Sequence, residues 1–261
     1  MGNYYKRQDE IEVLLWYNSF FGAQKTMKAV ITELKKVADA KKAVVLSRYF
    51  KTGKGEYGEG DIFLGVTVPK QRVIAGKYYK EVGLADIAKL LESSVHEHRF
   101  TALEMLVLKY EKAADEAAKK EIFDFYVKNR AGINNWDLVD TSAPYIIGDY
   151  LAYRPRSLLY RLAKSKKLWD RRIAVVSNYL FIKNGDFTDI CALTETLMAD
   201  SHPLIHKVCG WMLREMGKKN EMKLLEFLNG HYQKMPRIML SYAIERLPKK
   251  LKMTYTRPYT G

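Results

Sequence analysis

The segment NNWDLVD places an aromatic ring and two carboxylates where they can act together. On a helix, Trp136 and Asp140 lie four residues apart and share a face. Asp137 falls in the first turn, behind Asn134–Asn135, either of which can cap the helix. The helix dipole favours a carboxylate in a first turn, which is a sufficient structural explanation of Asp137. Asp140 has two interpretations: it pairs with Arg172, or it stabilises positive charge that develops on a substrate.

A second tryptophan, Trp211, follows Lys207 by four residues, so an aromatic ring again lies one helical turn from a position of interest. Tryptophan at helical spacing is often a core residue. Two tryptophans beside one carboxylate and flanking cations, however, also make a plausible pocket for a sugar or a base.

The histidines do not predict a metal site. His96 and His98 are two residues apart and point to different sides of a helix. His202 and His206 share a face, but no glutamate of an HExxH motif accompanies them. We therefore expect no metal and no cofactor, and we interpret these histidines as caps, surface groups or phosphate contacts.

The elements that must position these residues are helices. Apolar residues recur three and four positions apart along most of the chain, which predicts an all-α protein. The predicted helices cover residues 8–22, 24–42, 84–92, 97–112, 114–130, 155–164, 169–182, 187–199, 203–217, 220–229 and 235–247. Between them, Lys51–Asp61 alternates four glycines with charged residues, which is typical of a flexible surface loop. It lacks the GxxxxGK[ST] order of a nucleotide-binding loop.

Four of the predicted helices share a basic residue near their start. These residues are Arg99, Arg172, Lys207 and Arg237, at separations of 73, 35 and 30 residues. A unit of 30–40 residues with two helices predicts a HEAT-like solenoid, an α-α superhelix whose inner helices align. We expect the basic residues to form a stripe on its concave face, which suits a phosphate backbone. The alternative is that each side chain simply reaches solvent.

The composition favours a polyanionic partner. The chain has 261 residues, a formal net charge of +14 and a pI near 9.5. Nucleic acid is the first candidate and an anionic membrane surface the second. Residues 1–20 do not have the pattern of a signal peptide, and no apolar run approaches the length of a membrane span. We expect a cytoplasmic protein that does not bind membranes.

Several short motifs, in order, carry a resemblance to a known family. They are SRYF, FLGVTVPKQR, NNWDLVD, LWDRRIAVV, GWMLRE and MLSYAIERLP, and they extend from about residue 47 to 248. Each is weak alone, but in this order and spacing they resemble successive blocks of the AlkD-like DNA alkylation repair family. That family consists of HEAT-like DNA glycosylases. The chain departs from its pattern in the longer Lys51–Asp61 loop and in a basic tail.

The resemblance assigns roles to single residues. It implies that Asp140 is the catalytic carboxylate and that Trp136 and Trp211 act beside it. It also implies that Arg172 contacts the DNA backbone near the lesion and that Tyr49 borders the same cleft. Together with the basic stripe, the residues expected to bind DNA are Tyr49, Arg99, Arg172, Lys207, Arg214 and Arg237.

The predicted function is therefore removal of cationic N3- and N7-alkylated purines from duplex DNA. No lysine stands out as a Schiff-base nucleophile, so we expect simple hydrolysis without strand cleavage. We expect a monomer with one glycosylase domain, residues 1–248, and a basic C-terminal tail, residues 249–261. Two other functions fit the same pattern: a non-catalytic HEAT-repeat DNA-binding protein, and a HEAT scaffold whose concave face binds an acidic peptide.

Overall fold

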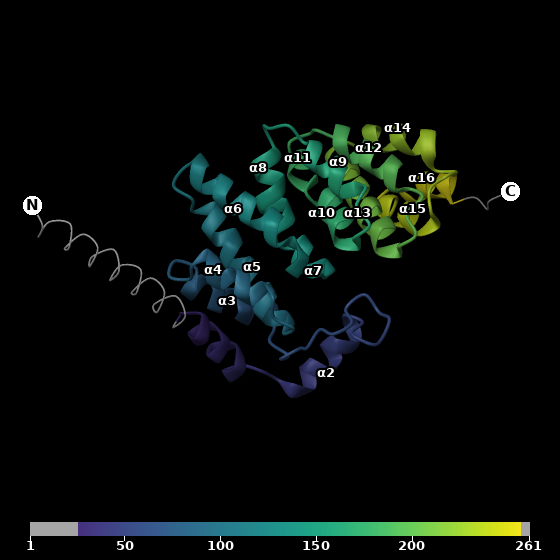
Figure 1. The fold of residues 1–261 in the computed structure, drawn as a ribbon. Helices are drawn as coiled ribbons and strands as arrows, with labels where there is room; N and C mark the ends of the chain where they lie inside the picture. The colour runs from purple at the N-terminus through teal and green to yellow at the C-terminus, as the bar shows by residue number, and fades with distance from the viewer. Residues whose placement is uncertain (1–25, 257–261) are drawn as a thin grey trace, which may run out of the picture. The chain divides into compact units, whose positions relative to one another are not determined.

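The computed structural model of the protein describes residues 26–256, and these residues form an all-helical fold (Figure 1). Within them there is no β-strand, only an isolated bridge between Ile62 and Val95. The prediction of an all-α protein is confirmed. The predicted helix 8–22 lies outside the described residues.

The chain divides into two compact units, Met1–Leu138 and Val139–Gly261. In the first unit, residues 26–36 are helical and precede the labelled helices. These are α2 (Ala40–Tyr49), α3 (Val68–Tyr78), α4 (Leu84–Leu91), α5 (His96–Glu111), α6 (Glu116–Asn129) and the 3-10 turn η1 (Arg130–Gly132). Helix α5 is buried on most of its surface and packs against α3, α4 and α6. It is the central helix of this unit.

The second unit begins within α7 (Trp136–Asp140) and continues as a series of short helices. These are the π-helix η2 (Pro144–Gly148), α8 (Asp149–Leu151), α9 (Ser157–Ala163), α10 (Leu168–Val176), α11 (Tyr179–Lys183), α12 (Thr188–Leu197), α13 (Pro203–Lys219), α14 (Glu221–His231), α15 (Arg237–Ala243) and α16 (Lys249–Tyr255). Residues 249–255 are thus helical, and Tyr255 is buried and donates a hydrogen bond to Asn229. The start of the predicted basic tail is therefore packed against the fold.

Stacked helices build the core of the second unit. Helix α9 packs on α10, α12 packs on α13, and α10, α13 and α15 pack one on the next. These three helices carry Arg172, Lys207 and Arg237, so the spacing of the basic residues does mark a structural repeat. Gly210 allows α13 and α15 to approach closely, because a Cβ at this position would lie 2.3 Å from the Met239 carbonyl oxygen.

Two predicted helices are broken in the structure. The predicted helix 24–42 is interrupted at residues 37–39, because the Asp39 carboxylate accepts the backbone N–H groups of Lys41 and Lys42 and caps a new helix, α2. The predicted helix 169–182 divides into α10 and α11 at Ser177 and Asn178. Both side chains donate hydrogen bonds back to backbone carbonyls of α10, which competes with continuation of the helix.

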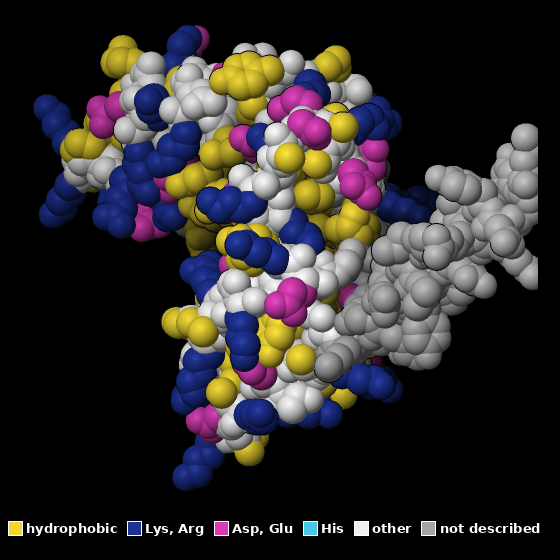
Figure 2. Space-filling model, turned by 90° about the vertical axis from the view of Figure 1, so that its left-hand side faces the viewer, with side chains coloured by type: hydrophobic (Ala, Val, Ile, Leu, Met, Phe, Trp, Pro, Cys, Tyr) yellow, Lys and Arg dark blue, Asp and Glu magenta, His cyan; other side chains and the backbone are white. Residues whose placement is uncertain are grey.

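None of the described helices has the properties of a membrane-spanning helix. In residues 26–256, no helix is both long enough and apolar enough to cross a bilayer. Figure 2 shows basic side chains, in dark blue, recurring over the face drawn, with acidic side chains between them.

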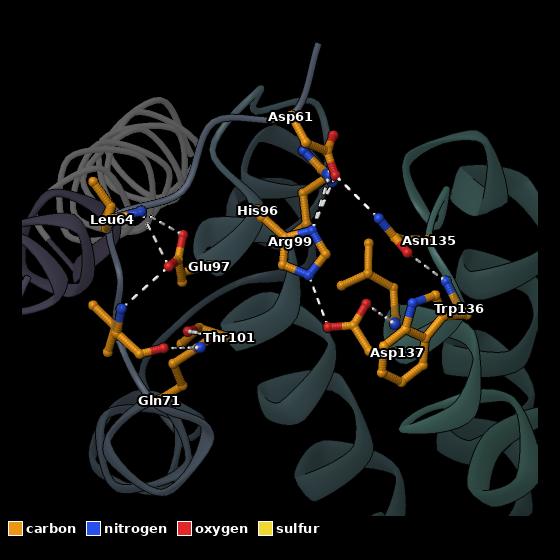
Figure 3. Close-up of polar contacts among 12 residues, drawn as sticks. Asp61, Leu64, Gln71, His96, Glu97, Arg99, Thr101, Asn135, Trp136 and Asp137 are labelled. Carbon is orange, nitrogen blue, oxygen red and sulfur yellow. Dashed lines mark hydrogen bonds and ion pairs between the residues drawn. The ribbon is translucent and has the colours of Figure 1, made fainter. Parts of the chain in front are cut away.

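A buried glutamate anchors the segment that follows the glycine-rich loop. Glu97, in the first turn of α5, is 1% exposed and accepts the backbone N–H groups of Leu64, Gly65 and Val66 at 2.8 to 3.2 Å (Figure 3). A buried carboxylate is tolerable when donors of this kind surround it. Glu97 thereby fixes the path of the chain between α2 and α3.

Candidate functional site

Asp140, the last residue of α7, is held by Arg172 of α10 in a two-pronged ion pair. Arg172 Nε lies 2.9 Å from Asp140 Oδ1, and Nη2 lies 2.7 Å from Oδ2. The third nitrogen, Nη1, donates to the Leu204 carbonyl oxygen at 3.1 Å. A planar fork of this kind fixes both the position and the plane of a carboxylate. The Asp140 side chain keeps 18% of its surface exposed, so the fork orients it without closing it off.

The structure thus contains the ion pair between Asp140 and Arg172, which was one of the two interpretations of Asp140. It also changes what is expected of Arg172, whose side chain is only 6% exposed. In this conformation the guanidinium faces a carboxylate and a carbonyl oxygen, not solvent. A contact between Arg172 and a DNA phosphate would require the guanidinium to give up part of its present hydrogen bonding.

Arg99 does not present a cation to solvent, and the expectation that it belongs to a DNA-facing stripe needs correction. Its side chain is 3% exposed. Nη2 donates to Asp61 Oδ1 at 2.6 Å, and Nη1 donates to the Ser93 carbonyl oxygen at 2.6 Å. The reason is local: α5 is the central helix of its unit, so a basic residue near its start is buried and must be paired.

Lys207 and Arg237 do remain available for phosphate contacts. Lys207 is partly exposed on α13 and Arg237 is exposed at the start of α15. Among residues 26–256, neither side chain has an ion-pair partner. Arg214, also on α13, forms an ion pair with Glu245. Its charge is therefore already partly compensated.

Trp211 is partly exposed on α13 and its indole ring is held in place by a hydrogen bond. Indole Nε1 donates to Glu215 Oε1, one helical turn later, at 3.2 Å. Glu215 also pairs with Lys218 at 2.6 Å. The ring therefore has a defined orientation before any ligand binds.

Trp136, in the first unit, lies in an aromatic cluster. Its ring stacks on Phe50 with centroids 5.1 Å apart and planes 11° apart. Tyr49 meets it edge-on at 5.9 Å, and Tyr49 is 62% exposed. The structure thus places together two aromatic residues that the sequence predicted for the same site. Phe50, the platform under Trp136, was missed, because an ordinary apolar residue gives no chemical signal.

Asp137 and Asn135 fix the start of α7, as the sequence suggested, but with an additional partner. Asn135 Oδ1 accepts the backbone N–H of Trp136 at 2.8 Å. Asp137 Oδ2 lies 2.8 Å from Nε2 of the buried His96. The role of His96 was not predicted, since a partner 41 positions away is invisible in a single sequence.

The chemistry that these side chains offer, each within its own unit, is electrostatic. A partly exposed, rigidly oriented carboxylate can stabilise a cation, and partly exposed indole rings can do so through their faces. Among residues 26–256, no group of three or more histidine, cysteine or acidic side chains is arranged to hold a metal ion.

Comparisons with known proteins identify the family of the chain and a similar fold. The sequence profile of the family described as "DNA alkylation repair enzyme" matches residues 30–247. A solved structure described as a predicted DNA alkylation repair enzyme from Enterococcus faecalis has a similar fold, with a TM-score of 0.62. The two sequences are 15% identical over 81% of this chain and 97% of the other. No curated protein matches this chain significantly in sequence.

Proposed function

Because the chain belongs to the family of DNA alkylation repair enzymes, we propose that it is a glycosylase for N3- and N7-alkylated purines in duplex DNA. Family membership supports an enzyme of DNA repair. The observation that supports glycosylase activity in particular is that the carboxylate of Asp140 is oriented by Arg172 and still 18% exposed. It stands in the motif WDLVD, at the position that the sequence resemblance marks as catalytic.

The substrate class explains why one carboxylate suffices. Alkylation at N3 or N7 leaves the purine with a positive charge. When the bond between C1′ and N9 breaks, its electron pair moves to the base and neutralises that charge. No general acid is then needed for the leaving group. The remaining demand is to stabilise the positive charge that passes to the sugar.

Asp140 meets that demand in the proposal. Its negative charge stabilises the oxocarbenium-like sugar and orients the water that adds to C1′. As the C–O bond forms, the water gives up a proton, for which the carboxylate is the acceptor. The products are the free alkylated base and an abasic site, with the phosphodiester backbone unbroken.

Trp136 and Trp211 are proposed to assist by offering electron-rich faces to the cationic sugar and base. Contacts of this kind are worth roughly 0.5–2 kcal/mol each. Lys207, Arg214 and Arg237 are proposed to contact phosphates, and Tyr49 to border the bound strand. For Arg172 we propose a partial exchange on binding, in which a phosphate takes one prong of the fork and leaves Asp140 more available to the sugar.

The test is release of 7-methylguanine or 3-methyladenine from methylated duplex DNA by the purified protein, measured under single-turnover conditions. We expect Asp140→Asn to lower the excision rate about a hundred- to thousandfold, because the charge is lost while the shape is kept. Binding should be unchanged or slightly tighter, because a negative charge near phosphates is removed.

Asp200→Asn is the matched control. Asp200 also pairs with an arginine of α10, at 2.6 Å from Arg171 Nε, and is 5% exposed. Its loss disturbs a similar ion pair in the same unit without touching the proposed chemistry, so excision should persist. Full activity of Asp140→Asn, or equal losses in both variants, would contradict the assignment.

A non-catalytic duplex-binding protein is the second candidate. The observation that favours it is that both Asp140 oxygens already accept hydrogen bonds from Arg172. Salt-dependent duplex binding by the wild-type protein without release of any alkylated base would support this reading over the glycosylase.

A further inference from the structure

His96 lies at the centre of a buried polar network that the proposed chemistry does not use. It is the first residue of α5 and is 2% exposed. Its Nδ1 lies 3.0 Å from Asp61 Oδ2 and its Nε2 lies 2.8 Å from Asp137 Oδ2 (Figure 3). An ionised carboxylate only accepts hydrogen bonds, and a neutral imidazole has a single N–H. Two such bonds therefore call for the imidazolium form.

The charges around His96 agree with that form. Burial lowers the pKa of His96, as does the nearby Arg99, but the Asp137 and Asp61 carboxylates raise it more, so the pKa lies above its ordinary value. Arg99 donates to the second oxygen of Asp61. Two carboxylates thus face two cations. Loss of the imidazolium proton would leave a net negative charge in the core, which is costly.

The network ties the start of α7 to two other segments. Asp61 ends the glycine-rich loop, and His96 begins α5. On the α7 side, Asp137 meets His96, and Asn135 donates from Nδ2 to Asp61 at 3.4 Å while its Oδ1 accepts the N–H of Trp136. Both neighbours of Trp136 in the chain are therefore fixed by this network.

A stack of rings makes a second connection between the same two residues. The His96 ring stacks on Phe63 at 4.5 Å, Phe63 on Phe50 at 5.0 Å, and Phe50 on Trp136 at 5.1 Å. The polar links fix the backbone of Trp136 and the stack fixes its ring. Both begin at His96.

We propose that His96 is a positioning residue, whose two hydrogen bonds hold the start of α7 so that Trp136 presents its indole face in one orientation. The consequence for catalysis rests on the proposed function, in which Trp136 contacts the substrate. The positioning itself is a property of the first unit and can be measured without substrate.

The first test uses the wild-type protein. The indole N–H resonance of Trp136, assigned with Trp136→Phe, and the ring nitrogens of His96 are followed by NMR as the pH rises. We expect the Trp136 signal to shift with the same midpoint as His96, above its ordinary pKa of about 6.5. A Trp136 signal that stays constant while His96 loses its proton would overturn the proposal.

The second test compares two buried histidines of α5. His96→Gln leaves a neutral amide that can donate to one aspartate but not reach both. His98→Gln is the matched control, since His98 is 7% exposed and its ring Nδ1 hydrogen-bonds with Ser93 Oγ at 2.9 Å, not with an aspartate. Burial lowers the pKa of His98 to about 4, so no charge is lost in this variant.

We expect His96→Gln to displace the Trp136 resonance and to slow single-turnover excision about ten- to hundredfold, with binding to undamaged duplex unchanged. His98→Gln should leave both readouts at wild-type values. Wild-type excision in His96→Gln, or equal losses in both variants, would contradict the positioning role. If the wild-type protein releases no base, the proposed function fails, and the Trp136 titration still decides whether His96 positions the ring.

Discussion

Asp137 and Asp140 lie three positions apart in one motif, yet they have different partners. Asp140 faces a guanidinium and stays 18% exposed, while Asp137 faces an imidazole and is 14% exposed. The sequence separates them correctly in one respect, because only Asp137 has a first-turn position that explains it without chemistry. The sequence does not show the second role of Asp137, which is to pair with His96, a buried residue 41 positions earlier in the chain.

That partner changes the stability expected of Asp137→Asn. From the helix dipole alone, the loss would be under about 1 kcal/mol. With His96 left short of a charged acceptor in the core, we expect the free energy of unfolding to fall by about 1–3 kcal/mol near pH 6. Denaturant unfolding of the wild type and the variant measures this difference. A loss of only a few tenths of a kcal/mol in the free energy of unfolding would show that the buried pair contributes little to stability.

The pH dependence of that difference has a definite sign. The pKa of His96 is raised in the folded protein, so its contribution is fully present below the unfolded value of 6.5 and is lost as the pH rises through the folded value. We expect the stabilities of the wild type and Asp137→Asn to converge as the pH rises above 6.5 and through the raised pKa of folded His96. A gap that stays constant as the pH rises would mean that His96 is already neutral in the folded protein.

Among the elements, the two longest helices were predicted well, and the interruptions of other helices were not. Predicted helix 97–112 matches α5 (His96–Glu111), and 203–217 matches α13 (Pro203–Lys219). The break between α10 and α11 depends on Ser177 and Asn178 turning their side chains back to the backbone, which the same residues on a helix surface need not do.

The segment around the glycine-rich loop shows the limit of a single sequence. Periodicity gives no sign that Glu97 binds three backbone N–H groups more than 30 positions earlier, or that His96 joins Asp61 to Asp137. From the letters HEHR, the histidines were interpreted as caps, surface groups or phosphate contacts, and Arg99 as a cation that faces DNA. Pairing across the fold, which decides the roles of these residues, appears only in three dimensions.

Gly210 tests the packing of the repeat. A Cβ at this position would lie 2.3 Å from the backbone oxygen of Met239 and 2.6 Å from Cβ of Tyr242, and neither can move as a flexible side chain would. We expect Gly210→Ala to push α13 and α15 apart and to lower the free energy of unfolding by about 1–3 kcal/mol. Thermal and denaturant unfolding both report this change.

Gly230, in α14, is the control for that substitution. It also lies in a helix of the second unit, but an added Cβ would meet nothing within 4 Å. Gly230→Ala should therefore be neutral or stabilise by up to about 1 kcal/mol, through helix propensity and reduced freedom of the unfolded chain. Equal destabilisation by the two alanines would mean that helix packing at Gly210 is not the cause.

At the scale of the whole molecule, net charge is the property that can be read most directly from the sequence. The net charge of +14 does not depend on the fold. The fold decides which cations remain available. It buries Arg99 and Arg172 in ion pairs and leaves Lys207 and Arg237 open to solvent on successive stacked helices. The predicted stripe thus has fewer exposed basic residues than the sequence pattern indicates, and those that are exposed lie in the second unit.

The exposure of Lys207 and Arg237 predicts how duplex binding responds to salt. Affinity for undamaged duplex should fall steeply as salt rises, because phosphate neutralisation releases counterions, with a slope of about −0.9 for each phosphate contacted. Lys207→Ala and Arg237→Ala should each weaken binding and reduce that slope by roughly one. Lys223→Ala is the control, because Lys223 of α14 already pairs with Glu226 at 2.7 Å and its charge is compensated. Fluorescence anisotropy over a series of salt concentrations gives all four slopes. If the wild-type slope were near zero, or if Lys223→Ala lowered it as much as Lys207→Ala did, net charge and not these two positions would govern binding.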